Sequence, residues 1–308
     1  MKRFLLLCPW FALLAFPLVE VSAHAITRSR VPKLRDWQAA AAYVKPRVGP
    51  RDLVSVAPAW ADPLLREVLG AQIDLPMAGR SDTSFYERLW SLSIRGARPA
   101  EAPPDETQLL EQRAFGRVQV ALWSLGKSRV RFDFARELAR AEVSVLRGDG
   151  ERACEWRTQR AGRGGALGAG VLAPRDRFVC KGEGVWVAPV VMEDLDLQPR
   201  YCVYQPALGQ GGRLRVRFRE VPLGDQLVLY AGVYYEHERM REGGPIELHV
   251  NLDGRRAAAL THRDGDGWKR LALPTARGTA ELGFEVTANE PRRRHFCWSA
   301  TTRDGSAR

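Results

Sequence analysis

The spacing of apolar residues divides the chain into three stretches of different character. Residues 4–19 form an almost continuous apolar run. Residues 36–125 combine short apolar runs of strand length with segments of helical spacing, and beyond residue 129 apolar and polar residues mostly alternate. This pattern predicts an N-terminal hydrophobic segment, then a small α/β layer, then an antiparallel β-sandwich.

In the second stretch, strands and helices are expected to alternate. Asp36 stands at a suitable capping position before an alanine-rich run, and Gly70 ends the next helical segment. Such alternation predicts a small Rossmann-like α/β domain over residues 26–126, without a phosphate-binding loop. The expected helices are residues 36–44, 62–69 and 105–113, and the expected strands are residues 52–57, 89–94 and 118–125.

The third stretch contains many short runs with two-residue periodicity, separated by Gly, Asp and Pro turn signals. Many short strands with this spacing predict an antiparallel sandwich, or jelly roll, over residues 127–308. The fold class of the whole chain is therefore α+β. The expected strands are residues 129–134, 141–146, 178–181, 185–191, 214–218, 227–235, 246–252, 268–273, 281–288 and 294–300.

The N-terminal segment has the order of features of a secretory signal. Lys2 and Arg3 precede the apolar run, and Ala23-His24-Ala25 follows it in the small-x-small pattern that signal peptidase cleaves. The run is shorter than the ~20 residues that a membrane span needs. Residues 1–25 are thus predicted to be a signal peptide, with membrane anchoring through residues 4–19 as the alternative. Either way the protein is expected to be exported and to be periplasmic, cell-surface or extracellular.

Cysteine use agrees with export. Beyond the signal the chain has Cys154, Cys180, Cys202 and Cys297, an even number that indicates disulfides in an oxidising compartment. Of the three possible pairings we expect Cys154 with Cys180, which flank a glycine-rich loop, and Cys202 with Cys297, which would tie the first and last strands of the sandwich. A zinc site is the rival interpretation, but no CxxC spacing supports it.

The charge is basic, at +11, and 41 of the 47 basic residues are arginine. These arginines are scattered through every segment instead of forming the clustered stripes that nucleic-acid binders show. Together with the export signal, this argues against nucleic acid as a partner. Anionic lipid headgroups or acidic glycans remain as electrostatic partners.

The segment 36–125 resembles part of a known enzyme family. The shared residues are Asp36-Trp37, Gly49-Pro50-Arg51-Asp52-Leu53-Val54, Pro58-Ala59-Trp60, Arg88-Leu89-Trp90 and Phe115-Gly116-Arg117-Val118. They resemble the extracytoplasmic region of membrane glycosyltransferases related to protein mannosyltransferases. That family places its catalytic acid between membrane helices, which this chain lacks, so the resemblance implies a partner or a detached domain of such an enzyme.

The third stretch resembles galactose-binding-like jelly rolls, which are common in carbohydrate-binding modules. The likeness rests on Pro199-Arg200-Tyr201-Cys202, Val221-Pro222-Leu223-Gly224, Asp266-Gly267-Trp268 and Arg294-His295-Phe296-Cys297-Trp298. Because fold likeness alone does not assign a ligand, the resemblance implies a binding or accessory module of unspecified ligand.

One surface of the sandwich combines residue types that suit a sugar. If residues 235–241 continue a strand, alternation places Tyr235, His237, Arg239 and Arg241 on one side, with Trp268 as a further candidate. An aromatic ring stacks on the C–H face of a sugar, and Arg and His donate hydrogen bonds to its hydroxyl or acid groups. The alternative is that Tyr235 packs inside the sandwich and the charged residues form an exposed hairpin end.

No catalytic or metal-binding pattern stands out. The chain has no GxSxG motif, and its carboxylate pairs (Asp194 with Asp196, Glu236 with Glu238) fit a solvated strand face. Asp264 and Asp266 match a fragment of a calcium loop, but the third carboxylate and the distal Glu of such a loop are missing, and a hairpin turn explains these residues more simply. We therefore expect a non-catalytic envelope protein without cofactor or metal, acting as a glycan-binding or accessory module. The alternatives are a partner of a membrane glycosyltransferase and a hydrolase whose site is assembled across strands.

Overall fold

The computed structural model describes residues 7–148, 150–162, 171–209 and 211–305, in two compact units. Unit 1 comprises Met1–Ile73 and Tyr86–Gly126, and unit 2 comprises Asp74–Phe85 and Lys127–Arg308. Residues 1–6 of the expected signal and residues 163–170 of the glycine-rich loop lie outside the described residues.

The helices are few and short apart from the first one. They are α1 Leu7–Arg30, α2 Leu34–Val44, α3 Asp62–Leu69, α4 Leu75–Ala78 and α5 Tyr235–Met240. The strands of unit 1 are β1 Asp52–Ala57, β2 Arg88–Ser93, β3 Gln108–Phe115 and β4 Val118–Ser124. The strands of unit 2 are β5 Val130–Asp133, β6 Glu142–Arg147, β7 Gly150–Ala153, β8 Glu155–Thr158, β9 Asp176–Cys180, β10 Val185–Glu193, β11 Pro199–Tyr204, β12 Arg213–Leu223, β13 Gln226–Val233, β14 Ile246–Leu252, β15 Arg255–His262, β16 Lys269–Pro274, β17 Gly278–Ala288 and β18 Phe296–Arg303.

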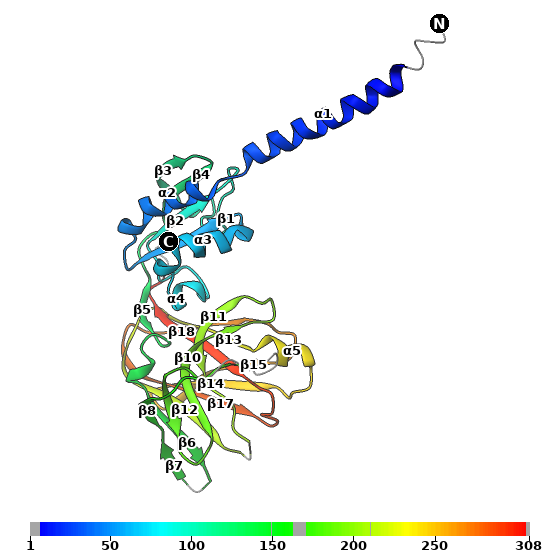
Figure 1. Cartoon of the computed structure of the whole chain (residues 1–308). Helices are drawn as coiled ribbons and strands as arrows, with labels where there is room; N and C mark the ends of the chain where they lie inside the picture. Colours follow the sequence, from blue (N-terminus) through cyan, green and yellow to red (C-terminus); the bar gives the residue numbers. More distant parts are fainter. Residues whose placement is uncertain (1–6, 149, 163–170, 210, 306–308) are drawn as a thin grey trace. The chain divides into compact units, whose positions relative to one another are not determined.

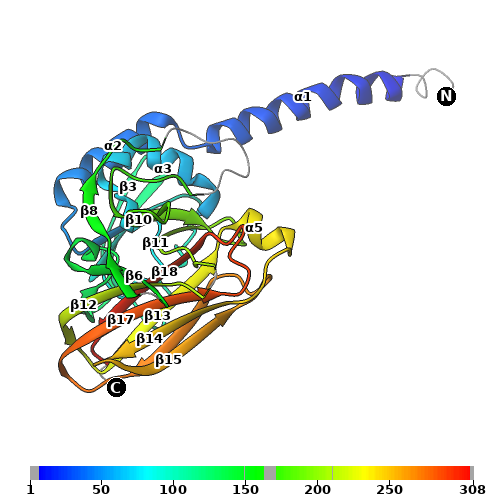
Figure 2. The ribbon, with the colours of Figure 1, turned by 90° about the horizontal axis from the view of Figure 1, so that it is seen from below.

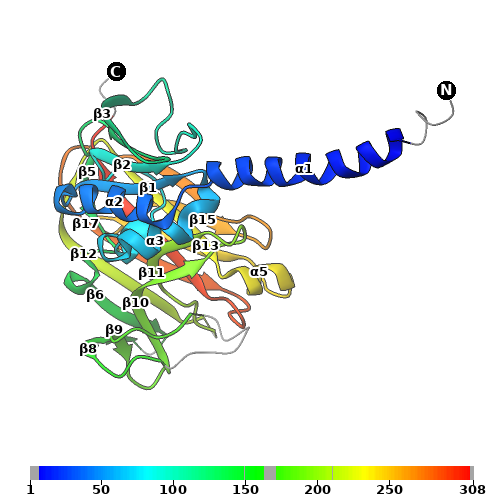
Figure 3. The ribbon, with the colours of Figure 1, turned by 45° about the horizontal axis from the view of Figure 1, so that its top comes forward.

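Unit 1 is built on a four-stranded sheet in the order β1-β2-β4-β3. Helices α2 and α3 lie side by side (Figure 3) and contact the sheet through β3, β4 and β1. Apolar faces of both helices are buried, with Trp37 and Leu65 among the least exposed side chains. At the start of β1 the buried carboxylate of Asp52 accepts hydrogen bonds from Arg88 Nε and Nη2, both at 2.7 Å, and from Trp90 Nε1 at 3.1 Å. This network joins β1 to β2.

The Rossmann-like part of the sequence prediction is not confirmed. Strands β1 and β2 are parallel, but β4 runs antiparallel to β2, and β3 runs antiparallel to β4. The expected helix over residues 105–113 is wrong, because residues 108–115 form strand β3. Its Leu, Glu, Gln and Arg residues favour a helix locally, but pairing with β4 through the turn at Gly116 overrides that preference.

Helix α1 includes residues 7–25 of the expected signal segment and continues past the predicted cleavage position to Arg30. It contains Pro17, and its described side chains, including Phe16, Val19 and Ile26, are exposed. In the part of the chain that the structure describes, no helix has the length and hydropathy needed to cross a membrane. Cleavage after Ala25 stays a prediction.

Unit 2 is a β-sandwich, as the alternating pattern predicted. One sheet runs β16-β13-β18-β11-β10-β9-β8, with β5 also paired to β18, and the other runs β15-β14-β17-β12-β6-β7. Figure 2 shows β14, β15 and β17 side by side. Side chains from the two sheets form one core, in which Phe284 stacks on Trp298 with ring centroids 4.1 Å apart. The sequence prediction missed four strands, namely β7, β8, β11 and β15.

A buried glutamine links the two sheets through the core. Gln205 has no exposed surface, and its Nε2 donates to the carbonyl oxygens of Leu214 at 2.7 Å and Phe284 at 3.1 Å. Its Oε1 accepts from Trp298 Nε1 at 2.7 Å. Because every side-chain hydrogen-bonding atom of Gln205 has a partner, this polar group costs little when buried.

Both expected disulfides are confirmed. Cys154 and Cys180 are bonded across 26 residues of sequence, and Cys202 and Cys297 across 95 residues. The first bond lies beside the β8–β9 pairing, and the second joins β11 to β18. The disulfides therefore cross-link the sandwich at two places.

One segment within residues 26–126 packs with the sandwich. Residues Asp74–Phe85, which include α4, belong to unit 2. The carbonyl of Gly79 accepts a hydrogen bond from the Tyr201 N–H at 2.6 Å, and the carboxylate of Asp82 accepts one from the Tyr230 hydroxyl at 2.8 Å. Arg303 Nη1 lies 2.8 Å from the same carboxylate. These contacts hold the segment against β11, β13 and β18.

Candidate functional site

The chain after β13 folds into helix α5, which lies at one end of the sandwich (Figure 1). The expectation that residues 235–241 continue a strand is therefore wrong, and its two-residue alternation does not hold. Glu236 and Glu238 stand in the first turn, where carboxylates favour a helix, and Arg241 ends the helix in the left-handed conformation at φ +54°. Helical periodicity decides which candidate side chains meet.

Tyr235 and Arg239 meet on the outer face of α5, because residues four apart are neighbours on a helix. The Arg239 guanidinium carbon lies 5.4 Å from the centre of the Tyr235 ring, within cation–π range. Arg239 Nη2 also donates to the Leu195 carbonyl at 3.2 Å, and the Tyr235 hydroxyl donates to Glu236 at 3.0 Å. These contacts hold the half-buried tyrosine ring and the exposed arginine together.

His237 points the other way, into a cluster of rings that we call the Tyr–His cluster: Tyr234, Tyr235, His237 and His295. The His237 ring centre is 4.6 Å from that of His295 and 5.6 Å from that of Tyr234. The Tyr234 and Tyr235 rings meet edge to face at 4.8 Å. His237 is buried, while Tyr234, Tyr235 and His295 are half-buried, so the cluster is accessible on one side.

Both histidines of the cluster are neutral near pH 7. Burial, and secondly the charge of His237, lower the pKa of His295 to about 4, and burial also lowers the pKa of His237. His295 Nδ1 accepts a hydrogen bond from the Val171 N–H at 3.2 Å, which leaves the proton on Nε2. Nδ1 of His237 is buried without a hydrogen-bond partner in the described protein. The cluster therefore offers neutral donors and acceptors.

Glu238 fixes α5 to the turn before β16. Its fully buried carboxylate accepts hydrogen bonds from the backbone N–H groups of Gly267 at 2.7 Å and Gly265 at 3.1 Å. Oε1 also lies 3.7 Å from Nε2 of the buried His262. Burial raises the pKa of Glu238, and the backbone hydrogen bonds oppose this rise. The side chain has a structural role in positioning the helix.

The turn itself is held by charged side chains. It is not the expected hairpin turn, because β15 and β16 on either side of it lie in different sheets. Asp264 accepts a hydrogen bond from the buried Arg294, whose Nη2 also donates to the Gly244 carbonyl at 2.5 Å. Asp266 pairs with Lys269 at 2.9 Å and accepts from the Arg263 N–H at 2.8 Å. Within the described ranges, no group of three or more His, Cys, Asp or Glu side chains is arranged to hold a metal ion.

Trp268 and Arg241 lie outside the Tyr–His cluster. The Trp268 indole lies across Gly232, where an added Cβ would come within 2.7 Å of the ring, and its Nε1 donates to the Ser81 hydroxyl at 3.2 Å. The Arg200 guanidinium lies 5.8 Å from the Trp268 ring. Arg241 is exposed at the end of α5.

The structure thus brings Tyr235 and Arg239 together and His237 against His295. Arg241 is exposed at the end of α5, and Trp268 packs against the same buried cluster as Tyr234. Sequence reasoning missed Tyr234 and His295. Strand alternation places Tyr234 on the opposite side from Tyr235, and His295 is 58 positions from His237 in sequence, so no local pattern groups these residues. That these residues bind a ligand stays a prediction.

Comparisons with known proteins give no family assignment. No protein-family model matches the chain, and no curated protein matches it. The likeness of residues 36–125 to membrane glycosyltransferases is therefore not supported.

Several solved structures align with this chain at low similarity. The CBM51-2 and INT domains of ZmpB from Clostridium perfringens, in complex with GlcNAc, align at 14% identity over 65% of this chain and 41% of that chain, with a TM-score of 0.31. The CBM51 of GH95 from Clostridium perfringens, in complex with methyl-galactose, aligns at 15% identity over 48% of this chain and 94% of that chain, with a TM-score of 0.28. The tandem CBM51 modules of the family 98 glycoside hydrolase Sp3GH98 from Streptococcus pneumoniae align at 11% identity over 63% and 57% of the two chains, with a TM-score of 0.31. The sandwich assignment rests on the strand pairing of this chain itself.

Proposed function

We propose that unit 2 is a non-catalytic glycan-binding module and that it binds a sugar at the Tyr–His cluster with Arg239. The observation that carries this proposal is the combination, on one accessible end of the sandwich, of half-buried tyrosine rings with a guanidinium and neutral imidazoles. A sugar ring packs its C–H face on an aromatic ring, and its hydroxyls exchange hydrogen bonds with donors and acceptors at the edge.

The geometry favours a neutral or weakly anionic sugar. Both imidazoles are neutral, since burial lowers the pKa of His237 and of His295. Arg239 is the cationic group next to the Tyr235 ring, and one of its nitrogens is already bonded to the Leu195 carbonyl. A single guanidinium beside a tyrosine suits a hydroxyl or one carboxylate of an envelope polysaccharide.

Binding of the full chain to an array of envelope polysaccharides, followed by calorimetry with a bound fragment, tests the proposal. Tyr235→Ala removes the stacking ring and is expected to weaken binding at least tenfold, about 1.4 kcal/mol. Arg239→Ala is expected to weaken it by a smaller factor, because that side chain is exposed.

Trp156→Ala provides the matched control. Trp156 is also an aromatic residue of unit 2 and is 36% exposed, but it lies on β8, at the far edge of the sheet from β13. The control variant should bind like the unaltered protein. Absence of any polysaccharide binding, or equal affinity of Tyr235→Ala and Trp156→Ala, would refute the proposal.

We include export in the proposal. The signal-like residues 1–25 and the two disulfides support it, because disulfides form and persist in oxidising compartments. N-terminal sequencing of the protein from its native cells should begin at Ile26, and a chain that still begins at Met1 would favour the anchor. No specific observation on the described residues favours a glycosyltransferase partner or a hydrolytic site, and both stay predictions from the sequence.

A further inference from the structure

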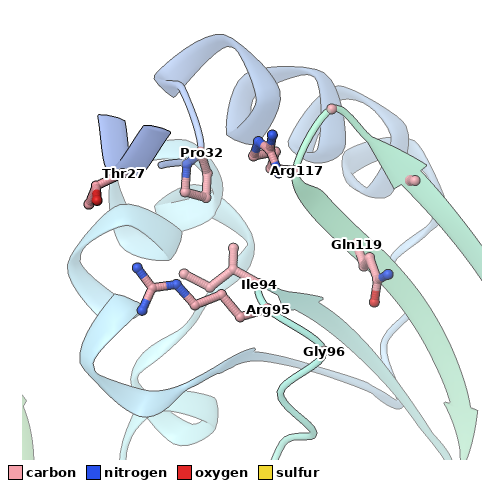
Figure 4. Close-up of a pocket in the computed structure, with 9 residues that line it drawn as sticks. Thr27, Pro32, Ile94, Arg95, Gly96, Arg117 and Gln119 are labelled. Atoms are coloured by element: carbon pink, nitrogen blue, oxygen red, sulfur yellow. The ribbon is translucent and has the colours of Figure 1, made fainter. Parts of the chain in front are cut away.

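Unit 1 contains a pocket that the sequence did not indicate. It has a volume of about 570 Å³ and opens where β2 ends and β4 begins (Figure 4). Ile94, Arg95 and Gly96 directly follow β2, while Arg117 and Gln119 lie at the start of β4. Thr27 at the end of α1 closes another side. The pocket is thus built from three segments that are distant in sequence, and its volume lies within the ~300–1,000 Å³ range of small-molecule sites.

The pocket is positively charged. Its lining includes Arg95 and Arg117 and no acidic residue, and neither guanidinium has an acidic partner among the described residues. The carboxylate of Asp36 lies behind the Gly116 turn, where it accepts hydrogen bonds from the backbone N–H groups of Lys33 at 3.2 Å and Arg117 at 3.5 Å. It also lies 3.9 Å from Arg35 Nε. Asp36 is therefore engaged with its own neighbours, and two guanidinium charges are available to a ligand.

Arg95 stands in a conformation that does not suit an arginine. Its φ is +56° and that of Gly96 is +71°, and the Ala97 N–H donates to the Ile94 carbonyl at 3.0 Å to close the turn. Such turns, in which both central residues have positive φ, favour Gly, Asn or Asp. For other residues the left-handed conformation is strained, and non-glycine residues held in it cluster at functional sites. A strained arginine that lines a charged pocket indicates that its side chain has a use there.

We propose that this pocket binds the oxyanion, phosphate or carboxylate, of a sugar-sized ligand. Arg95 and Arg117 supply charge-assisted hydrogen bonds, which are the strongest kind for such groups. The Thr27 hydroxyl adds a donor. Gln119 Oε1 accepts from Gln112 Nε2 at 3.3 Å, so its own amino group is available to donate. The buried side chain of Ile94 contributes an apolar wall for the remainder of the ligand. The site lies in unit 1 and does not depend on the glycan site proposed for unit 2.

Calorimetric titration of the full chain at low ionic strength tests this proposal, because salt screens exposed charges. The probes are glucose 1-phosphate, glucuronate and glucose. We expect the anionic probes to bind and glucose not to bind. Binding of glucose 1-phosphate alone would assign the oxyanion as phosphate, and binding of glucuronate alone would assign it as carboxylate. Failure of both anionic probes to bind, or equal binding of glucose, would overturn the proposal.

Three variants distinguish binding at this pocket from a general effect of positive charge on the protein. Arg95→Gly removes the guanidinium and relieves the left-handed strain, so it should lose at least tenfold in affinity while its thermal midpoint stays the same or rises. Arg117→Gln should lose a comparable factor. Arg66→Gln also removes one positive charge from unit 1, but Arg66 is on α3 in an ion pair with Asp62, and this variant should bind normally. Wild-type affinity in Arg95→Gly and Arg117→Gln, or equal loss in Arg66→Gln, would refute the assignment.

Discussion

The disulfide between Cys202 and Cys297 should contribute more to stability than the one between Cys154 and Cys180. Both Cys202 and Cys297 are completely buried, and their bond closes 95 residues of sequence, whereas the other closes 26. Replacing each pair by alanines removes one cross-link at a time. The two double variants of the same sandwich serve as controls for each other.

The magnitudes follow from the loop lengths. In the chain-entropy model a cross-link lowers the entropy of the unfolded chain more when the closed loop is longer. Loops of these two lengths correspond to about 4.7 and about 3.5 kcal/mol at 25 °C. All four cysteines are buried, so the loss of packing is similar in the two variants. We therefore expect a difference of about 1 kcal/mol between the two variants, which comes from loop length.

Hydrogen exchange of the full chain, read by mass spectrometry, provides the assay. The slowest amides of β17 report the free energy of opening the sandwich without interference from unit 1. The β17 amides should lose more protection from exchange in the Cys202/Cys297 variant. An equal loss in both double variants, or a larger loss in the Cys154/Cys180 variant, would refute this prediction. It would mean that native-state strain or residual structure in the unfolded chain, and not loop length, decides the stabilisation.

Further predictions concern pH and single side chains. The pKa of His295 is about 4 in the folded protein and near 6.5 in the unfolded chain, so the unfolded chain binds more protons between these values. The free energy of unfolding should therefore fall by about 1–2 kcal/mol from pH 7 to pH 4, which is less than the full pKa difference would give because the ring is half-exposed. Thermal melts of His295→Gln should show a smaller fall over the same pH range. Gly243→Ala would place a Cβ 2.1 Å from Nε of the buried Arg294 and should cost about 1–3 kcal/mol in urea unfolding, whereas Gly244→Ala has 3.6 Å of clearance and should be nearly neutral. Asp52→Asn removes the charge that holds β1 to β2 and should destabilise unit 1 by about 2–3 kcal/mol, and unchanged exchange in β1 would contradict this.

Much of the sandwich was predictable, because its strands are half-buried and alternate in polarity. Strand β12 alternates buried and more exposed positions and has glycine turn signals on either side, so pattern alone locates it. Strands β7 and β8 escaped prediction because their residues are mostly exposed and carry no buried face. Strand β15 was missed for a related reason, since few of its positions are buried.

The sequence predicted less of the candidate sites than of the sandwich. The residue types at 235–241 indicated a sugar-binding surface, but the pattern YYEHERMR is compatible with a strand or a helix, so the partners of each side chain could not be read from it. Helix formation after β13 decided that Tyr235 meets Arg239 and that His237 meets His295. The pocket beside Arg95 has no local signal at all, because it forms only when α1, β2 and β4 come together.

By itself the sequence determined the export-like segment, the presence of disulfides and the sandwich, since each depends on local composition or on a periodicity that burial imposes. The choice among the three possible cysteine pairings depends on which strands meet, so only the tertiary structure decided it. The tertiary structure alone decided that β3 is a strand, that residues 74–85 pack on the sandwich, and that Arg95 takes a left-handed conformation. The physical reason is that strand pairing and the closing of turns depend on residues far away in the chain, and these contacts outweigh local preferences of a few tenths to about 1 kcal/mol per residue.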